Sequence, residues 1–152
     1  MKAVIQRVSC SNVKVDNEIK GIIGKGMLVL LGVENGDDEQ ECDLLAKKIA
    51  VLRIFSDEND KMNLSLRDID GEVLVISNFT LCGDCRKGRR PFFGQAGNPE
   101  LAEKLYERFC EKLKEQSVRK VEKGIFGADM KVEILNDGPV TIILDSKELP
   151  HK

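Results

Sequence analysis

Residues 2–33 read KAVIQRVSCSNVKVDNEIKGIIGKGMLVLLGV and predict four consecutive strand segments. The segment KAVIQRVSC alternates apolar and polar residues, which is typical of a strand with one buried face. NVKV and KGIIG flank the polar link DNE, and this arrangement predicts a hairpin. GMLVLLGV is continuously apolar and bounded by glycines, so it predicts a buried strand. Strands joined by such short turns favour an antiparallel sheet.

Two helices are expected to interrupt this β-rich pattern. Asp37 or Asp38 can cap the first helix, whose apolar residues recur on one face. The second helix is expected over residues 99–116, because Asn98 is a good N-cap and Pro99 suits the first helical position. The chain therefore reads as an α+β fold.

Three later apolar segments predict further strands. EVLVISNFTL (72–81) is expected to form one buried strand. MKVEIL (130–135) and VTIILD (140–145) flank the tight link NDGP, so these two segments are candidates for a hairpin.

Length, charge and cysteine content narrow the class of protein. A chain of 152 residues is expected to form a single domain spanning 1–152. The net charge of −2 gives no overall attraction for polyanions, so any nucleic-acid binding must use a local patch. The odd count of five cysteines argues against a disulfide framework, and Cys82 and Cys85 form a lone CxxC, which predicts no zinc site. No apolar run is long enough for a membrane, so we expect a cytoplasmic protein.

Residues 77–93, SNFTLCGDCRKGRRPFF, carry the candidate chemistry. Ser77 and Thr80 come after the apolar run EVLVI, at the end of the expected strand, where a hydroxyl can act as a nucleophile or simply bond to the backbone. The only histidine is His151, and no lysine lies nearby to act as a base. Pattern alone therefore favours hydroxyls with a structural role.

The stretch RKGRRP concentrates positive charge in one loop. It can be a solvated loop or a phosphate-binding loop, since arginine pairs with phosphate through two parallel hydrogen bonds. Its four cations are Arg86, Lys87, Arg89 and Arg90.

Three segments together resemble one known family. These are MKAVIQRV (1–8), LRIFSDENDKMNLSLRDIDGEVLVISNFTL (52–81) and FGADMKVEILNDGPVTIILDS (126–146). In this order and spacing they are similar to the D-aminoacyl-tRNA deacylases over nearly the whole chain. The resemblance implies hydrolysis of the ester joining a D-amino acid to the 3′ end of tRNA, without a cofactor. It also implies a homodimer, each subunit an antiparallel sheet curled into a partly open barrel with two main helices packed outside.

The resemblance also implies a catalytic motif, Ser-Gln-x-Thr in the family. Here it falls on Ser77, Asn78 and Thr80, with Phe79 between them. Asn78 replaces the usual glutamine, which keeps the amide on a side chain shorter by one methylene.

A second family motif falls on residues 136–141 without departure. The resemblance implies that its Gly138–Pro139 bond is cis and reaches into the partner's active site, and that Arg7 helps to hold it. Further family positions line the adenosine pocket: Phe126, Ala128 and Met130.

These expectations suggest a hypothesis for catalysis without a base. An aminoacyl ester is already activated, and the ribose 2′-hydroxyl can assist water, so the backbone N–H groups of residues 79 and 80 need only stabilise the oxyanion. Thr80 as the nucleophile is the alternative. Gly138 and Pro139 would exclude L-amino acids by occupying the space of their side chains. Rival functions are a non-catalytic RNA-binding module, a serine hydrolase for small esters and an interaction protein that only dimerises.

Overall fold

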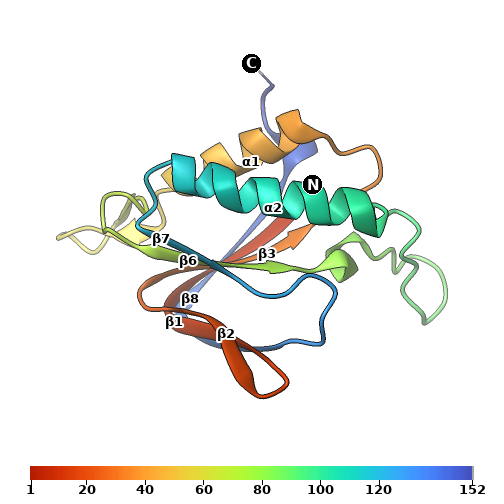
Figure 1. The fold of residues 1–152 in the computed structure, drawn as a ribbon. Coiled ribbons are helices and arrows are strands. Elements are labelled where there is room, and N and C mark those ends of the chain that lie inside the picture. Colours follow the sequence, from red (N-terminus) through yellow and green to blue (C-terminus); the bar gives the residue numbers. More distant parts are fainter. Residues whose placement is uncertain (152) are drawn as a thin grey trace.

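The computed structural model describes residues 1–151 (Figure 1). The strands are β1 (Lys2–Val15), β2 (Glu18–Ile23), β3 (Gly26–Gly32), β4 (Phe55–Ser56), β5 (Met62–Leu64), β6 (Glu72–Ser77), β7 (Lys120–Lys123) and β8 (Lys131–Asp145). The helices are α1 (Glu39–Val51) and α2 (Pro99–Glu115), with short 3₁₀ turns η1 (Phe79–Cys82) and η2 (Ser146–Glu148). Neither α1 nor α2, the α-helices of the described residues, is long and apolar enough to cross a membrane.

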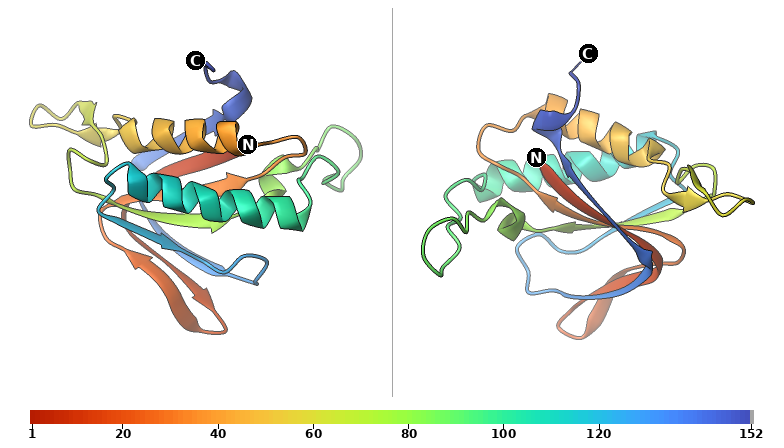
Figure 2. Two further views of the ribbon diagram at one scale, coloured as in Figure 1. Left: turned by 45° about the horizontal axis from the view of Figure 1, so that its top comes forward. Right: turned by 180° about the vertical axis from the view of Figure 1, so that it is seen from behind.

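The main sheet has the strand order β2-β1-β3-β6-β7, and β8 pairs with β1. It curls strongly, and both helices lie side by side on its outer face (Figures 1 and 2). This confirms the expected α+β fold. The sheet is mixed, however, because β3 pairs with β6 and β6 with β7 in parallel. The reason is that α1 lies between β3 and β6 and α2 between β6 and β7, and parallel neighbours need such crossovers.

The helices begin where the capping residues predicted. The Asp38 side chain accepts hydrogen bonds from the backbone N–H groups of Gln40 and Glu41. The Asn98 side chain accepts one from Leu101, at 2.9 Å. The Tyr106 hydroxyl donates to the carbonyl oxygen of Val75 (2.9 Å), which fixes α2 on β6. The buried face of α2 consists of Ala102, Leu105, Tyr106, Phe109, Cys110 and Leu113.

The hairpin predicted around NDGP is wrong. Residues 131–145 form one long strand, because β1 is long enough to pair antiparallel with both halves of it. Gln6 pairs with Thr141 and Val8 with Asn136, so the residues between them on β8 bulge out of the ladder opposite Arg7. NDGP therefore interrupts a strand rather than reversing the chain.

Candidate active site

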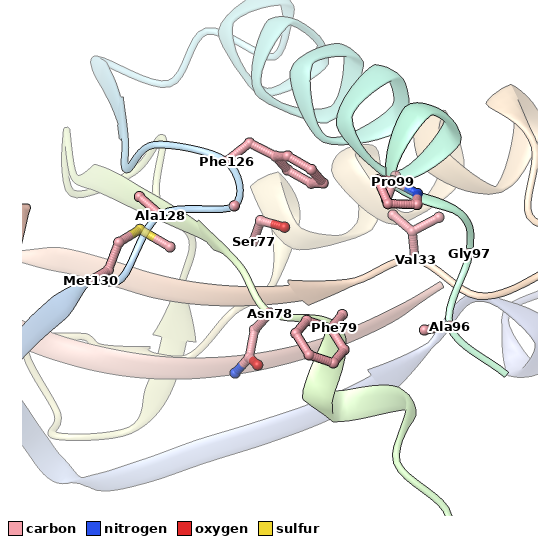
Figure 3. A pocket seen from close by; sticks show the side chains of 12 residues that line it. Val33, Ser77, Asn78, Phe79, Ala96, Gly97, Pro99, Phe126, Ala128 and Met130 are labelled. Carbon is pink, nitrogen blue, oxygen red and sulfur yellow. The ribbon is translucent and has the colours of Figure 1, made fainter. Parts of the chain in front are cut away.

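A cavity of about 480 Å³ opens where β6, the start of α2 and the loop before β8 meet (Figure 3). This volume lies within the range of about 300–1,000 Å³ that is typical of small-molecule sites. Among residues 1–151, no ionisable side chain lines it. The lining residues are Val33, Ser77, Asn78, Phe79, Ala96, Gly97, Pro99, Ala102, Phe126, Gly127, Ala128 and Met130.

The end of β6 brings the first candidate residues to the cavity. β6 ends at Ser77, so the strand expected to run to residue 81 is shorter than predicted. The turn that follows packs closely over Gly32 of β3: a Cβ on Gly32 would lie 3.1 Å from the Cβ of Leu81 and 3.2 Å from the oxygen of Asn78. Figure 3 shows the Ser77 hydroxyl directed into the cavity.

Thr80 is exposed and does not line the cavity. Its hydroxyl donates to the side-chain oxygen of Asn78, which is an amide and therefore not a base. The backbone N–H groups of Phe79 and Thr80 precede the first hydrogen bond of η1, and within residues 1–151 they have no acceptor. The site thus offers free backbone donors at Phe79 and Thr80, and the described residues that line the cavity include no group that could deprotonate a hydroxyl. Such an arrangement can stabilise the oxyanion of an ester, but lacks the base that a serine-type nucleophile needs.

The loop 126–130 closes the other side of the cavity. The backbone N–H of Ala128 donates to the oxygen of Ile125 (3.2 Å), which tightens the loop. The Phe126 ring packs against Tyr106 of α2, with ring centroids 6.1 Å apart. Three side chains predicted from this loop, those of Phe126, Ala128 and Met130, therefore share one cavity with the motif at the end of β6.

Comparison with known proteins identifies the family. The family model for D-Tyr-tRNA(Tyr) deacylase matches residues 4–145. The chain belongs to this family. A D-aminoacyl-tRNA deacylase of Clostridioides difficile (strain 630) is 60% identical over 148 residues, covering 97% of this chain and 99% of the relative. One of Persephonella marina is 59% identical over 149 residues, covering 98% of this chain and 100% of the relative.

Solved structures agree with this deacylase fold. A structure titled c-Myc DNA Unwinding Element Binding Protein has a TM-score of 0.89 and 42% identity, over 95% of this chain and 98% of the other. A probable eukaryotic D-amino acid tRNA deacylase has a TM-score of 0.80 over 94% and 97% of the two chains, at 16% identity, and shows the fold alone. The family resemblance read from the sequence is therefore confirmed.

The cavity also contains residues that sequence reasoning missed. They are Val33, Ala96, Gly97, Pro99, Ala102 and Gly127. The backbone N–H of Gly97 donates to the oxygen of Val33 (2.9 Å), and a Cβ on Gly97 would lie 3.2 Å from the Val33 Cγ1. In the sequence, Ala96 and Gly97 are two small residues just before the N-cap of α2. Small residues at such a position indicate only a tight connection into a helix, and they do not by themselves predict a cavity.

The second deacylase motif lies outside the cavity of its own chain. Arg7 holds it: its Nε donates to the oxygen of Asp137 (3.0 Å) and its Nη1 to that of Ile54 (2.9 Å). The Gly138–Pro139 peptide bond is cis, as the resemblance implied. Gly138 has a φ of +145°, and a Cβ there would lie 2.6 Å from the backbone nitrogen of Val140. Only glycine fits this position.

The basic loop projects from the end of the molecule at which α2 begins (Figure 1). All four of its cations are exposed. Arg86 is paired with Asp84, at 2.9 and 2.7 Å, and hydrogen bonds from Arg86 lower the pKa of Asp84 to about 2. In the described part of the chain, Lys87, Arg89 and Arg90 form no ion pair.

The CxxC pair is split between two environments. Cys82 is buried and Cys85 is exposed. Within residues 1–151, no group of three or more histidine, cysteine or acidic side chains is arranged to hold a metal ion.

Proposed function

We propose that this chain hydrolyses the ester joining a D-amino acid to the 3′ end of tRNA, as a single deacylase domain acting in the cytoplasm. Relatives that are 60% identical over nearly their full length are D-aminoacyl-tRNA deacylases. The observation that carries the proposal is the cavity itself. It combines the motif at Ser77 with the loop at Phe126, next to unpaired backbone donors and without any ionisable side chain.

Hydrolysis in this site uses the reactivity of the substrate. Water adds to the ester carbonyl carbon, and the carbonyl oxygen takes up negative charge beside the N–H groups of Phe79 and Thr80. One such donor contributes about 10²–10³ in rate. The adjacent 2′-hydroxyl of the ribose relays the proton. The bond to the 3′ oxygen then breaks, that oxygen takes up the proton, and the free amino acid and tRNA leave.

The substrate pocket is completed by a second copy of the chain. β8 pairs with β1 along one edge only, so its other edge is open. Several apolar side chains of β8 are exposed in the single chain. Ile143 is 76% exposed, and Leu135 is exposed as well. Long apolar edge strands are normally covered, and a symmetric dimer is the commonest solution. Such a dimer brings Gly138 and Pro139 to the partner's cavity.

Chirality follows from the placement of this rigid bulge. Arg7 of β1 and Asn136 of β8 fix it, because the Asn136 side chain donates to the backbone oxygens of Arg7 (2.9 Å) and Val140 (3.1 Å). A wall of backbone at Gly138 and Pro139 collides with the side chain of an L-amino acid and leaves a D side chain free. Selection by exclusion accepts many D-amino acids.

The basic loop binds the phosphates of the acceptor end. Three of its cations are free of ion pairs in the described residues, on a chain whose net charge is −2. A non-catalytic RNA-binding module would use the same loop, but would have no use for the cavity.

The proposal is tested by filling the cavity with a larger side chain. Ala128 is half-buried at its wall, and Ala128→Trp should reduce single-turnover deacylation of D-Tyr-tRNA by about 100-fold or more, equivalent to about 2.7 kcal/mol. Met62→Ala, on the distant β5, is the control and should match the unmodified chain. Full activity in a folded Ala128→Trp variant would show that hydrolysis does not take place in this cavity. If the unmodified chain does not hydrolyse D-Tyr-tRNA, the non-catalytic RNA-binding module is the function that remains.

A further inference from the structure

Three exposed phenylalanines gather beside the cavity, although the chain has only six in all. They are Phe79, Phe92 and Phe93, and Phe92 is 61% exposed. The Phe79 and Phe93 rings meet edge to face, with centroids 5.2 Å apart at 74°. Exposed apolar side chains that cluster in this way mark a binding surface more often than scattered ones do.

Two glycines fix the rings in place. A Cβ on Gly94 would lie 2.1 Å from the Cζ of Phe92, so the Phe92 ring rests directly on the glycine backbone. A Cβ on Gly83 would lie 3.0 Å from the Cε1 of Phe93. The backbone of Phe92 also exchanges two hydrogen bonds with Asp84, at 2.8 and 2.9 Å. The aromatic surface is therefore held in position while much of the Phe92 ring stays in solvent.

These rings connect two hollows. Phe79 lines the cavity described above, and Phe92 lines a second, open hollow of about 670 Å³ together with Asp84, Arg86 and Lys87. Phe93 follows Phe92 directly in the chain, and its ring contacts that of Phe79. A path of aromatic side chains thus leads from the candidate ester site to the cationic loop.

Aromatic rings combined with cations are the composition of surfaces that bind unpaired nucleic acid, where bases stack on rings and phosphates meet the cations. An acidic peptide would use the cations but would have no need of the exposed ring faces. The observations therefore favour a single strand.

We propose that Phe92 stacks on a base of the unpaired segment that precedes the terminal nucleotide of tRNA, with the phosphates of that segment on the basic loop. The inference rests on the proposed function, because it assumes that the terminal nucleotide enters the cavity lined by Phe79. It adds a site for the upstream bases, and makes Phe92 a determinant of binding to the single-stranded end.

The test compares RNA hairpins with and without a single-stranded 3′ overhang, by fluorescence anisotropy. Phe92→Ala should weaken binding of the overhang hairpin by about 5- to 150-fold, the usual range for loss of stacking on one base. Phe92→Tyr keeps the ring and should bind as the unmodified chain does. Met62→Ala, at 58% exposure on β5, is the matched control for removing an exposed apolar side chain and should change neither affinity.

The affinities are compared as a double-mutant cycle, in which one change is Phe92→Ala and the other is removal of the single-stranded overhang from the RNA. A loss confined to the overhang hairpin supports stacking. Equal losses on both hairpins, no loss on either, or a Phe92→Tyr variant as weak as Phe92→Ala would overturn it. Deacylation of D-Tyr-tRNA by the unmodified chain is measured in parallel. An active chain with no coupling rejects the stacking site alone, whereas an inactive chain rejects the proposed function.

Discussion

Replacement of Thr80 by alanine separates the two mechanisms that remain for ester cleavage. The Thr80 hydroxyl is exposed, and it donates a single hydrogen bond to the Asn78 amide. No histidine, lysine or carboxylate among the lining residues can take up its proton. If hydrolysis depends on the backbone donors and on the 2′-hydroxyl of the substrate, Thr80→Ala removes only the hydrogen bond from the Thr80 hydroxyl to Asn78.

The size of the effect follows from that role. One hydrogen bond between uncharged groups contributes about 0.5–1.5 kcal/mol, so Thr80→Ala should slow deacylation by about 2- to 12-fold. Loss of a true nucleophile in a protease triad costs about a million-fold. The two mechanisms therefore predict results that differ by several orders of magnitude.

The assay is single-turnover hydrolysis of D-Tyr-tRNA at saturating protein, which isolates the chemical step. Thr80→Ser retains the hydroxyl and serves as the control, with a rate close to that of the unmodified chain. A fall to the spontaneous rate in Thr80→Ala, with folding and tRNA binding intact and with Thr80→Ser active, would refute catalysis by backbone donors.

Three further predictions concern binding, selection and assembly. Arg89→Gln combined with Arg90→Gln should weaken tRNA binding and reduce the slope of log K against log salt by about 1.4, as expected for two lost phosphate contacts; an unchanged slope would make this loop merely solvated. Glycyl-tRNA should be deacylated about 100-fold faster than L-alanyl-tRNA, since glycine has no side chain to strike the wall, and equal single-turnover rates would contradict exclusion by backbone. Ile143→Lys should yield monomers in sedimentation and lose D-Tyr-tRNA hydrolysis, whereas Met62→Lys should remain dimeric and active; an active Ile143→Lys monomer would remove the shared site.

Local chemistry in the sequence was sufficient to predict the helices. The Asn98–Pro99 pair and Asp38 mark helix starts because capping depends on a few neighbouring atoms. The resemblance likewise identified side chains that meet in one cavity, at Ser77 and Phe126.

Strand pairing was harder to predict because it depends on distant partners. NDGP resembles a hairpin turn, but the length of β1 lets both flanking segments pair with it, and the link becomes a bulge. The parallel pairing of β3 with β6 arises from the α1 crossover, which an order of strands alone does not reveal. Gly97 was missed for a similar reason: its importance lies in its approach to Val33, more than sixty positions earlier in the chain.

The central claim is that the cavity beside Ser77 hydrolyses aminoacyl-tRNA and selects its substrate by chirality. Its most direct test is a side-by-side measurement of single-turnover deacylation of D-Tyr-tRNA and L-Tyr-tRNA by the unmodified chain. The proposed site predicts rapid release of D-tyrosine, and release of L-tyrosine at the spontaneous rate. Equal rates for the two enantiomers would contradict chiral exclusion, and spontaneous rates for both would contradict the hydrolase itself.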